Sequence, residues 1–279
     1  MLITAEMVRD LREKTGAGMM DCKKALTETG NMEAAITYLR EKGLSAAAKK
    51  SGRVASEGLV GVVLEGAKAA IIEVNCETDF VAKNADFQAL VYNLAQRALQ
   101  VKDLVADSQG LINDKIATIG EKIAIRRYVV LQGGDLYGAY LHSGGVIGAV
   151  VELKGASSAQ QNLAKDLAMH VAAAAPQFLS RSDVDAETLK AERSIFRTQV
   201  LEQGKPENMV DRIVDGKMEK YFSEVCLLEQ KFVKDPDMAI SKLLKDANVT
   251  LTRFVRYKVG EGIEKKADDF AQEVAKMIG

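Results

Sequence analysis

Residues 69–84 read AAIIEVNCETDFVAKN, an apolar run followed by a polar connection that contains a phenylalanine. The apolar half predicts a strand, and apolar residues at helical spacing predict a helix over residues 87–100. The phenylalanine of the connection, Phe80, lies between Asp79 and Lys83. Connecting loops run over the surface, where an aromatic ring contributes little to folding. The fold therefore gives no reason of its own for Phe80.

The same pattern of strands and helix occurs a second time along the chain. A predicted hairpin and helix fill residues 59–100, and the same order returns within residues 137–174. When the copies are aligned, the first carries about six extra residues between strand and helix, and they fall around residues 78–81. This weak repeat predicts two β-β-α subdomains with antiparallel sheets.

The N-terminal residues have a helical pattern. Residues 4–43 predict three short helices, with breaks at Gly18 and Gly30 and an end at Gly43. The stretch 45–53 is rich in alanine and lysine and predicts a linker. A small bundle joined flexibly to the remaining chain is expected.

The C-terminal half predicts a mixture of helices and strands. Narrow apolar stripes among charges favour an antiparallel helical hairpin over residues 186–224, projecting from the body. Strands are predicted at 225–232 and 249–259, around a short helix at 238–246. The chain then ends in an amphipathic helix, with apolar residues at Phe270, Val274, Met277 and Ile278.

These elements together predict the α+β class. The expected architecture is an N-terminal three-helix bundle of the ubiquitin-associated type, two repeated β-β-α core subdomains, a helical hairpin and a C-terminal helical module. The expected divisions are 1–53 for the bundle and linker, 54–136 for the first core subdomain, 137–180 with 225–262 for the second, 181–224 for the hairpin and 263–279 for the C-terminal module.

Composition gives no electrostatic argument for a nucleic-acid or membrane partner. The 279 residues contain 38 Lys+Arg and 39 Asp+Glu, so the formal net charge is −1. No apolar run reaches the length of about 18 residues that a membrane span needs, and the N-terminus lacks the pattern of a signal peptide. A cytoplasmic protein without direct nucleic-acid or membrane binding is expected.

Cysteine and histidine are few and scattered, which gives no pattern for catalysis or metal binding. Cys22, Cys76 and Cys226 are odd in number and far apart, as in a reduced cytosolic protein. The two histidines, His142 and His170, cannot form a histidine-rich metal site. No metal and no cofactor are expected, and Cys76 is interpreted as a buried thiol at a strand end rather than a nucleophile.

The residues taken alone leave several alternatives open. Phe80 is compatible with a core position under its own loop, and Lys23 with a solvated helix face. Asp21 is compatible with a helix cap, and His142 with an ordinary turn. At the level of the whole protein, a binding module fused to an enzyme and an RNA-binding translation protein are the two rival classes.

Four spaced motifs resemble those of the bacterial elongation factor Ts family. They are TGAGMMDCKKAL at 15–26, EVNCETDFVA at 73–82, AMHVAA at 168–173 and VGEGIEK at 259–265. The resemblance extends over essentially the whole chain. One departure is Val146, which follows Gly144-Gly145 where family members often carry a basic residue.

The resemblance implies a guanine nucleotide exchange factor that performs no bond-making chemistry. Its partner would be elongation factor Tu, the GTPase that delivers aminoacyl-tRNA. The bundle would dock on the nucleotide domain of the GTPase, the first core subdomain would approach its magnesium and phosphate site, and the second would contact its far domain. The hairpin would be a coiled-coil element, with a homodimer as one outcome.

The resemblance also implies roles for individual residues. An exchange wedge would consist of Thr78, Asp79, Phe80 and Val81. The partner would be contacted by Arg12, Met19, Met20, Asp21, Lys23, His142, Gly144, Gly145 and His170.

Overall fold

The computed structural model describes residues 3–264, and the predicted helix with Phe270, Val274, Met277 and Ile278 lies outside the described residues. The fold is α+β, as the sequence predicted. The chain divides into two units, which are described separately below. Unit 1 consists of Met1–Gly61, Ile72–Val129 and Lys258–Gly279, and unit 2 of Val62–Ile71 and Val130–Tyr257.

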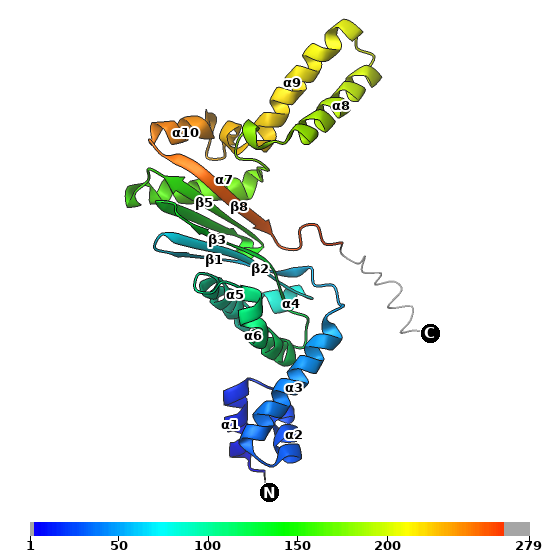
Figure 1. Ribbon diagram of the computed structural model, residues 1–279, viewed down its shortest axis with the longest axis vertical. Coiled ribbons are helices and arrows are strands. Elements are labelled where there is room, and N and C mark those ends of the chain that lie inside the picture. Colours follow the sequence, from blue (N-terminus) through cyan, green and yellow to red (C-terminus); the bar gives the residue numbers. More distant parts are fainter. Residues whose placement is uncertain (1–2, 265–279) are drawn as a thin grey trace. The chain divides into compact units, whose positions relative to one another are not determined.

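Three helices at the N-terminus form a bundle with its own core (Figure 1, blue). They are α1 (Ala5–Thr15), α2 (Met19–Thr29) and α3 (Met32–Lys50). The Thr4 side chain caps α1 by accepting a hydrogen bond from the Met7 amide. The predicted three-helix arrangement is present, and its buried core contains Val8, Leu11, Cys22, Ala25, Leu26, Ala35 and Leu39.

Two details of the predicted bundle are wrong. Helix α3 does not end at Gly43 but continues to Lys50, so most of the predicted linker is helical. Gly43 is buried in α3, where an added Cβ would lie 3.4 Å from the Cβ of Ala117 in α6 (Leu104–Ile119). The glycine thus marks a close approach of two helices rather than a helix end.

The first sheet has the strand order β1-β2-β3, with β1 at Glu57–Glu65, β2 at Lys68–Cys76 and β3 at Ala124–Gln132. Strand β2 is buried at every position after its first residue. The single-turn helix α4 (Asp79–Ala82) and the helix α5 (Ala85–Ala98) follow β2. The predicted hairpin and helix of the first copy are therefore present, whereas α6 and β3 were not predicted.

The second sheet has the order β4-β5-β8, with β4 at Leu136–His142, β5 at Ile147–Lys154 and β8 at Thr250–Lys258. Strands β4 and β5 are antiparallel, in a register that pairs Leu136 with Leu153 and His142 with Ile147. Helix α7 (Gln161–Ala174) packs on both strands. This is the β-β-α pattern predicted for the second copy. Its core includes Val151, Leu153, Leu167, Val171, Leu227 and Ile240.

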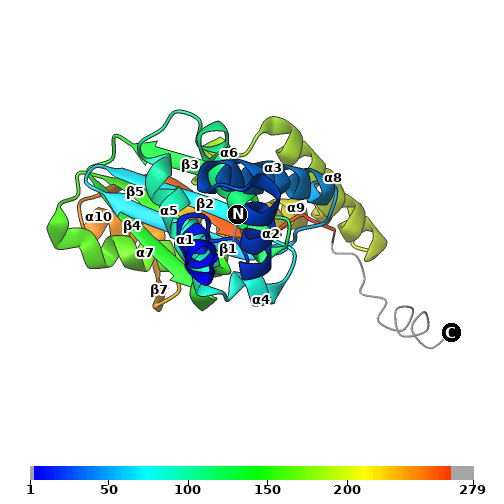
Figure 2. The same cartoon turned by 90° about the horizontal axis from the view of Figure 1, so that it is seen from below.

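Two helices, α8 (Ala186–Glu202) and α9 (Glu207–Val225), form the predicted helical hairpin and lie side by side in both Figure 1 and Figure 2. Their buried contacts involve Val200, Val210, Val214 and Met218, so the hairpin has a small core of its own. At its base, Arg181 donates to the carboxylates of Glu219 and Glu229.

The strand predicted at 225–232 is largely wrong. Helix α9 continues to Val225, a 3-10 turn occupies Leu227–Glu229, and only Lys231–Phe232 forms a strand, β6. Strand β6 pairs with β7 (Asp235–Ala239), and α10 (Ile240–Asp246) follows. Residues 225–227 are buried where they join the hairpin to the core, and the Leu227 amide donates to the carbonyl of Phe178. These residues are apolar because they are buried, which gave the segment the sequence pattern of a strand although it pairs with no neighbouring strand over most of its length.

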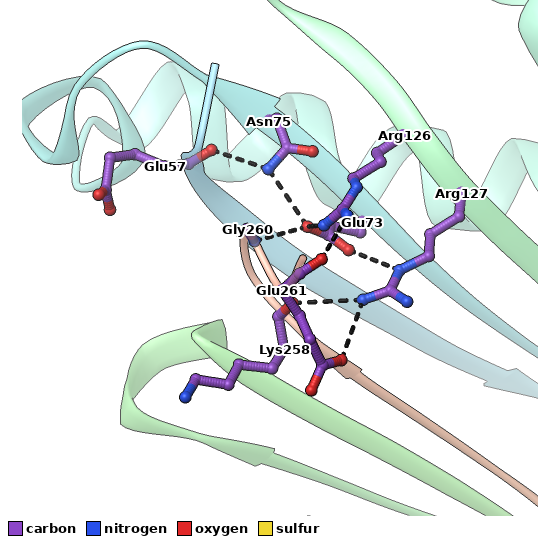
Figure 3. A network of polar contacts seen from close by, with 8 residues as sticks. All are labelled: Glu57, Glu73, Asn75, Arg126, Arg127, Lys258, Gly260 and Glu261. Carbon is purple, nitrogen blue, oxygen red and sulfur yellow. Dashed lines mark hydrogen bonds and ion pairs between the residues drawn. The ribbon is translucent and has the colours of Figure 1, made fainter. Parts of the chain in front are cut away.

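A fully buried carboxylate in β2, Glu73, lies at the centre of a polar network in unit 1 (Figure 3). It accepts hydrogen bonds from Arg126 Nη1 at 3.0 Å and Arg127 Nε at 2.7 Å, both in β3. Asn75 Nδ2 and the backbone amide of Gly260 donate to it as well, at 3.2 and 2.8 Å. Burial by itself would raise the pKa of Glu73, but the hydrogen bonds from Gly260, Arg126 and Arg127 outweigh it and hold the pKa below its usual range.

The same network holds the segment after β8 against the first sheet (Figure 3). Arg126 donates to the carbonyl of Glu261, and Arg127 lies 3.5 Å from the Glu261 carboxylate. Gly260 has a φ of +69°, and a Cβ there would lie 2.3 Å from the carbonyl oxygen of Ser56, so only glycine fits. The two arginines thus link the central strand, the third strand and the segment that precedes the undescribed C-terminal residues.

Candidate functional site

Phe80 is the most exposed large apolar side chain among the described residues, with 81% of its surface accessible. It lies in α4, whose one turn is capped by Thr78; the Thr78 hydroxyl accepts from the Val81 amide at 3.4 Å. Ala82 is buried on the inner side of the turn, and Val81 is half-buried. The alternative in which Phe80 fills the core beneath its own loop is therefore wrong. Residues 78–81 are called the wedge segment below.

The exposed ring lies beside an ion pair on the same turn. Lys83 Nζ donates to Asp79 Oδ2 at 2.6 Å, and both side chains are exposed. The hydrogen bond from Lys83 lowers the pKa of Asp79, so this carboxylate stays ionised at neutral pH. The wedge segment presents an apolar ring and a negative charge together.

A carboxylate from a distant part of the chain holds the start of the wedge segment. Glu121 accepts from the Thr78 hydroxyl at 2.6 Å, and from the backbone amides of Glu77 and Thr78 at 3.0 Å each. In return, the Glu77 carboxylate accepts from the Lys122 amide at 2.6 Å. Glu121 was not among the predicted site residues. In the sequence, Glu121 is marked only by its position directly after Gly120, which ends α6. That position does not predict the contact of Glu121 with Thr78.

Cys76 is a buried thiol at the end of β2, as the sequence indicated. Its sulfur donates to the carbonyl of Thr78 at 3.2 Å. Burial, together with the negative charges of Glu121 and Glu57, raises the pKa of Cys76 to about 12. Because the thiol is protonated at neutral pH, it serves packing and not nucleophilic chemistry.

The predicted contact residues of the bundle lie on its surface. Met19 and Met20, at the start of α2, have 51% and 74% of their surface accessible. Asp21 pairs with Lys42 of α3, and the cap position of α2 belongs to Gly18, so the alternative of Asp21 as a helix cap is wrong. Exposed methionines adapt to differently shaped partners, which makes this surface suited to protein binding.

Arg12 and Lys23 belong to the same bundle, on α1 and α2 respectively. Both side chains are exposed to solvent.

A second exposed feature lies in unit 2, at the turn between β4 and β5. Gly144 has a φ of +68°, which the tight turn requires and which L-residues rarely adopt. His142 is exposed, and its Nδ1 lies 3.3 Å from the Tyr140 hydroxyl. Leu141 and Val146, which flank the turn, have 44% and 43% of their surface accessible. Leu141 was not predicted as a site residue, because a single leucine at a strand end resembles an ordinary core residue.

The predicted partner contact of His170 is wrong for the structure described. Its side chain is fully buried in α7, where its Nε2 lies 2.9 Å from Gln230 Oε1 and the Val233 amide donates to its Nδ1. An accepting Nδ1 and a donating Nε2 define the neutral tautomer. Burial lowers the pKa of His170 despite the hydrogen bond that its Nε2 donates to Gln230, so this imidazole belongs to the core.

Within residues 3–264, no group of three or more His, Cys, Asp or Glu side chains has the arrangement of a metal site. In the same range, no helix is both long enough and apolar enough to cross a bilayer. The features that do stand out are an exposed phenylalanine on a capped turn, exposed methionines on a bundle and an exposed apolar hairpin turn. Exposed apolar side chains of this kind are typical of a protein that binds another protein.

The family scan identifies the kind of binding protein. The sequence model of a family described as elongation factor TS matches residues 77–261. This match covers more than half of the chain, which therefore belongs to the elongation factor Ts family. The family supports a role in translation elongation as a nucleotide exchange factor for elongation factor Tu, without bond-making chemistry.

Proposed function

We propose that this protein binds the GDP form of elongation factor Tu and promotes GDP release by pressing the wedge segment against the magnesium and phosphate site. It stays bound until GTP enters. The observation that carries the proposal is the 81% exposure of Phe80 on a turn that is capped and hydrogen-bonded at its start. An exposed ring held in one place contributes little to its own fold and suits insertion into a partner.

The nature of the partner's site explains why a small wedge suffices. A GTPase holds GDP through backbone donors around the phosphates and through Mg²⁺. Mg²⁺ demands near-ideal octahedral geometry, so small displacements of its surroundings weaken it. Phe80 would fill a pocket between partner helices and contribute roughly 2 kcal/mol or more of binding, as interface anchors do. The ionised Asp79 would repel the bound phosphates and disturb the surroundings of the metal.

Two further surfaces would supply affinity rather than displacement. On the bundle, the contacts would come from Arg12, Met19, Met20, Asp21 and Lys23. On the second core subdomain, they would come from His142 and Gly144, with Leu141 and Val146 beside them. The predicted contact of Gly145 is not part of this surface, because Gly145 is buried. Because Val146 and Leu141 are exposed apolar residues, the contact at this turn would be apolar where many family members place a basic residue.

The helical hairpin is the proposed element for self-association. Ile195, Leu201 and Met209 on α8 and α9 have 49%, 47% and 46% of their surface accessible. A second copy of the hairpin would cover them. A translation factor of this kind would work in the cytoplasm, and it would contact tRNA only through elongation factor Tu.

The release of a fluorescent GDP from purified elongation factor Tu, followed by stopped flow, tests the proposal. Phe80→Ala should lower the release rate at saturating protein at least tenfold and leave thermal unfolding within about 1 °C of the unmodified chain. Tyr92→Ala is the matched control, because Tyr92 is another exposed aromatic residue of the first core subdomain, with 56% of its surface accessible on α5. Unchanged release with Phe80→Ala would contradict the proposal.

A further inference from the structure

The start of the wedge segment depends on one carboxylate that belongs to another part of the chain. Glu121 accepts three hydrogen bonds there, two from backbone amides at 3.0 Å and one from the Thr78 hydroxyl at 2.6 Å. Hydrogen bonds to an ionised acceptor are shorter and stronger than those between neutral groups. This carboxylate therefore fixes the direction in which the chain enters α4.

Helix α4 needs such support because it is only four residues long, Asp79–Ala82. A single helical turn is unstable alone, since one or two hydrogen bonds do not offset the cost of ordering its residues. The Thr78 hydroxyl donates its one proton to Glu121, which leaves its oxygen free to accept from the Val81 amide. The cap of the turn and the bond to Glu121 thus depend on the same oxygen atom.

The support continues from Glu121 to the residues that follow the bundle. The next residue, Lys122, donates its backbone amide to Glu77 at 2.6 Å and its ammonium group to the carbonyl of Arg53 at 2.8 Å. The Arg53 guanidinium lies 3.3 Å from the Glu77 carboxylate. The loop after α6 is therefore tied both to the wedge segment and to the chain leaving α3.

We infer that Glu121 is a positioning residue for nucleotide exchange: it acts through Thr78 to hold Phe80 in the exposed orientation from which it enters the partner. The inference rests on the proposed function of the wedge segment. It implies that losing the Glu121 carboxylate slows the displacement step but leaves the docking surfaces of the bundle and the β4–β5 turn intact. The maximal release rate then falls, while the concentration for half-saturation changes little.

The kinetic test uses Glu121→Gln in the full-length chain, with the GDP-release assay run over a range of protein concentrations. Glutamine keeps one acceptor oxygen and replaces the other by an NH₂ group, which cannot accept, so it cannot take all three hydrogen bonds that the two carboxylate oxygens share. The expected result is a maximal release rate about tenfold lower, with half-saturation within about twofold of the unmodified protein. Asp114→Asn is the matched control, because Asp114 is an exposed carboxylate on α6 and should leave both quantities unchanged.

Substitutions at Thr78 separate positioning from a general loss of structure. Thr78→Ser keeps the hydroxyl and should keep the rate, whereas Thr78→Val has nearly the same shape without the hydroxyl and should reproduce Glu121→Gln. Combining Glu121→Gln with Phe80→Ala should slow release no further than Phe80→Ala alone, because both changes remove the same action. Additive effects of the two changes would contradict the inference.

A spectroscopic measurement examines the positioning without the GTPase. The chain contains no tryptophan, so Phe80→Trp introduces a single indole reporter. Adding Glu121→Gln should lower the fluorescence anisotropy of that indole, and adding Asp114→Asn should not. Unchanged anisotropy together with an unchanged release rate would overturn the inference. If Phe80→Ala leaves release intact, the proposed function fails, and the anisotropy alone then decides whether Glu121 orders the segment.

Discussion

Thr78 and Glu121 are separated by 43 residues in the sequence, and a hydrogen bond of 2.6 Å joins the Thr78 hydroxyl to Glu121 Oε1. This bond joins the end of β2 to the loop that follows α6. This bond orders a turn that exposes its one aromatic residue. It therefore connects the fold of unit 1 to the surface that would act on the partner.

The buried carboxylate of Glu73 predicts a large loss of stability when its charge is removed. Glu73→Gln removes the negative charge that Arg126 and Arg127 share and one of the two oxygens that accept from them, and breaking a buried pair in this way costs about 3 to 5 kcal/mol. Urea unfolding at pH 7 measures the loss. Glu65→Gln at the exposed end of β1 is the control and should change the free energy of unfolding by less than about 0.5 kcal/mol.

The same carboxylate predicts a dependence of stability on pH in the acid range. The pKa of Glu73 is lower in the folded protein than its ordinary value of 4.5, so the unfolded chain binds this proton first as the pH falls. The stabilisation is complete above pH 4.5 and is lost as the pH falls through the folded value. Glu73→Gln should flatten this part of the curve, and an unchanged slope would contradict the role assigned to the network.

Burial of His170 predicts a second dependence, at higher pH. Its pKa lies below the ordinary value of 6.5 because the imidazole is desolvated. As the pH falls below 6.5, the imidazole is therefore protonated in the unfolded chain before it is protonated in the folded chain. Stability should therefore decrease as the pH falls below 6.5. His170→Gln should remove this slope below pH 6.5, as followed by thermal unfolding. An unchanged slope in His170→Gln would contradict the assignment of this imidazole to the core.

The helical hairpin should be dispensable for folding. Replacing residues 190–217 by a short glycine-rich connection removes the distal part of α8 and α9 and keeps Arg181 with both its carboxylate partners. Leu189 and Met218 line the same small cavity, so the new ends lie close together. A soluble, monomeric product by light scattering, with unfolding within a few degrees of the intact chain, is expected. Aggregation or loss of the thermal transition would show that the hairpin core supports the body.

The spacing of apolar residues predicted those helices and strands that have one apolar face. The strands and helix of the second copy, and the hairpin with its charged outer faces, have one apolar side and regular spacing. Strand β3 escaped prediction because Arg126 and Arg127 interrupt its apolar pattern, and their reason for being there is Glu73 in a different strand. When charged residues of a strand pair with a residue of the neighbouring strand, the strand lacks the alternation of apolar and polar residues from which strands are predicted.

The predicted site residues came from the family resemblance, and the residues alone drew attention only to a side chain that is out of place in its own segment. Phe80 is such a residue, since an aromatic side chain in a polar loop has no local reason to be there. His170 follows the apolar face of α7, and only its contacts with Gln230 and Val233 show that it is a core residue. Glu121 is an ordinary polar residue after a helix, and its role comes from a contact across 43 residues that no local pattern encodes.

The most direct test of the exchange mechanism is the difference between this protein's affinities for nucleotide-free and for GDP-bound elongation factor Tu. Binding of this protein and binding of GDP to elongation factor Tu are reciprocally coupled. If this protein weakens GDP binding by a given ratio, GDP weakens the binding of this protein by the same ratio. Titration calorimetry in the presence of Mg²⁺ should show tighter binding to the nucleotide-free form by a factor on the order of 10² or more, at the upper end of ordinary couplings. Combining Asp79→Ala with Phe80→Ala should shrink this ratio while leaving much of the affinity for the GDP-bound form. Equal affinity of the unmodified protein for the two forms would contradict the account.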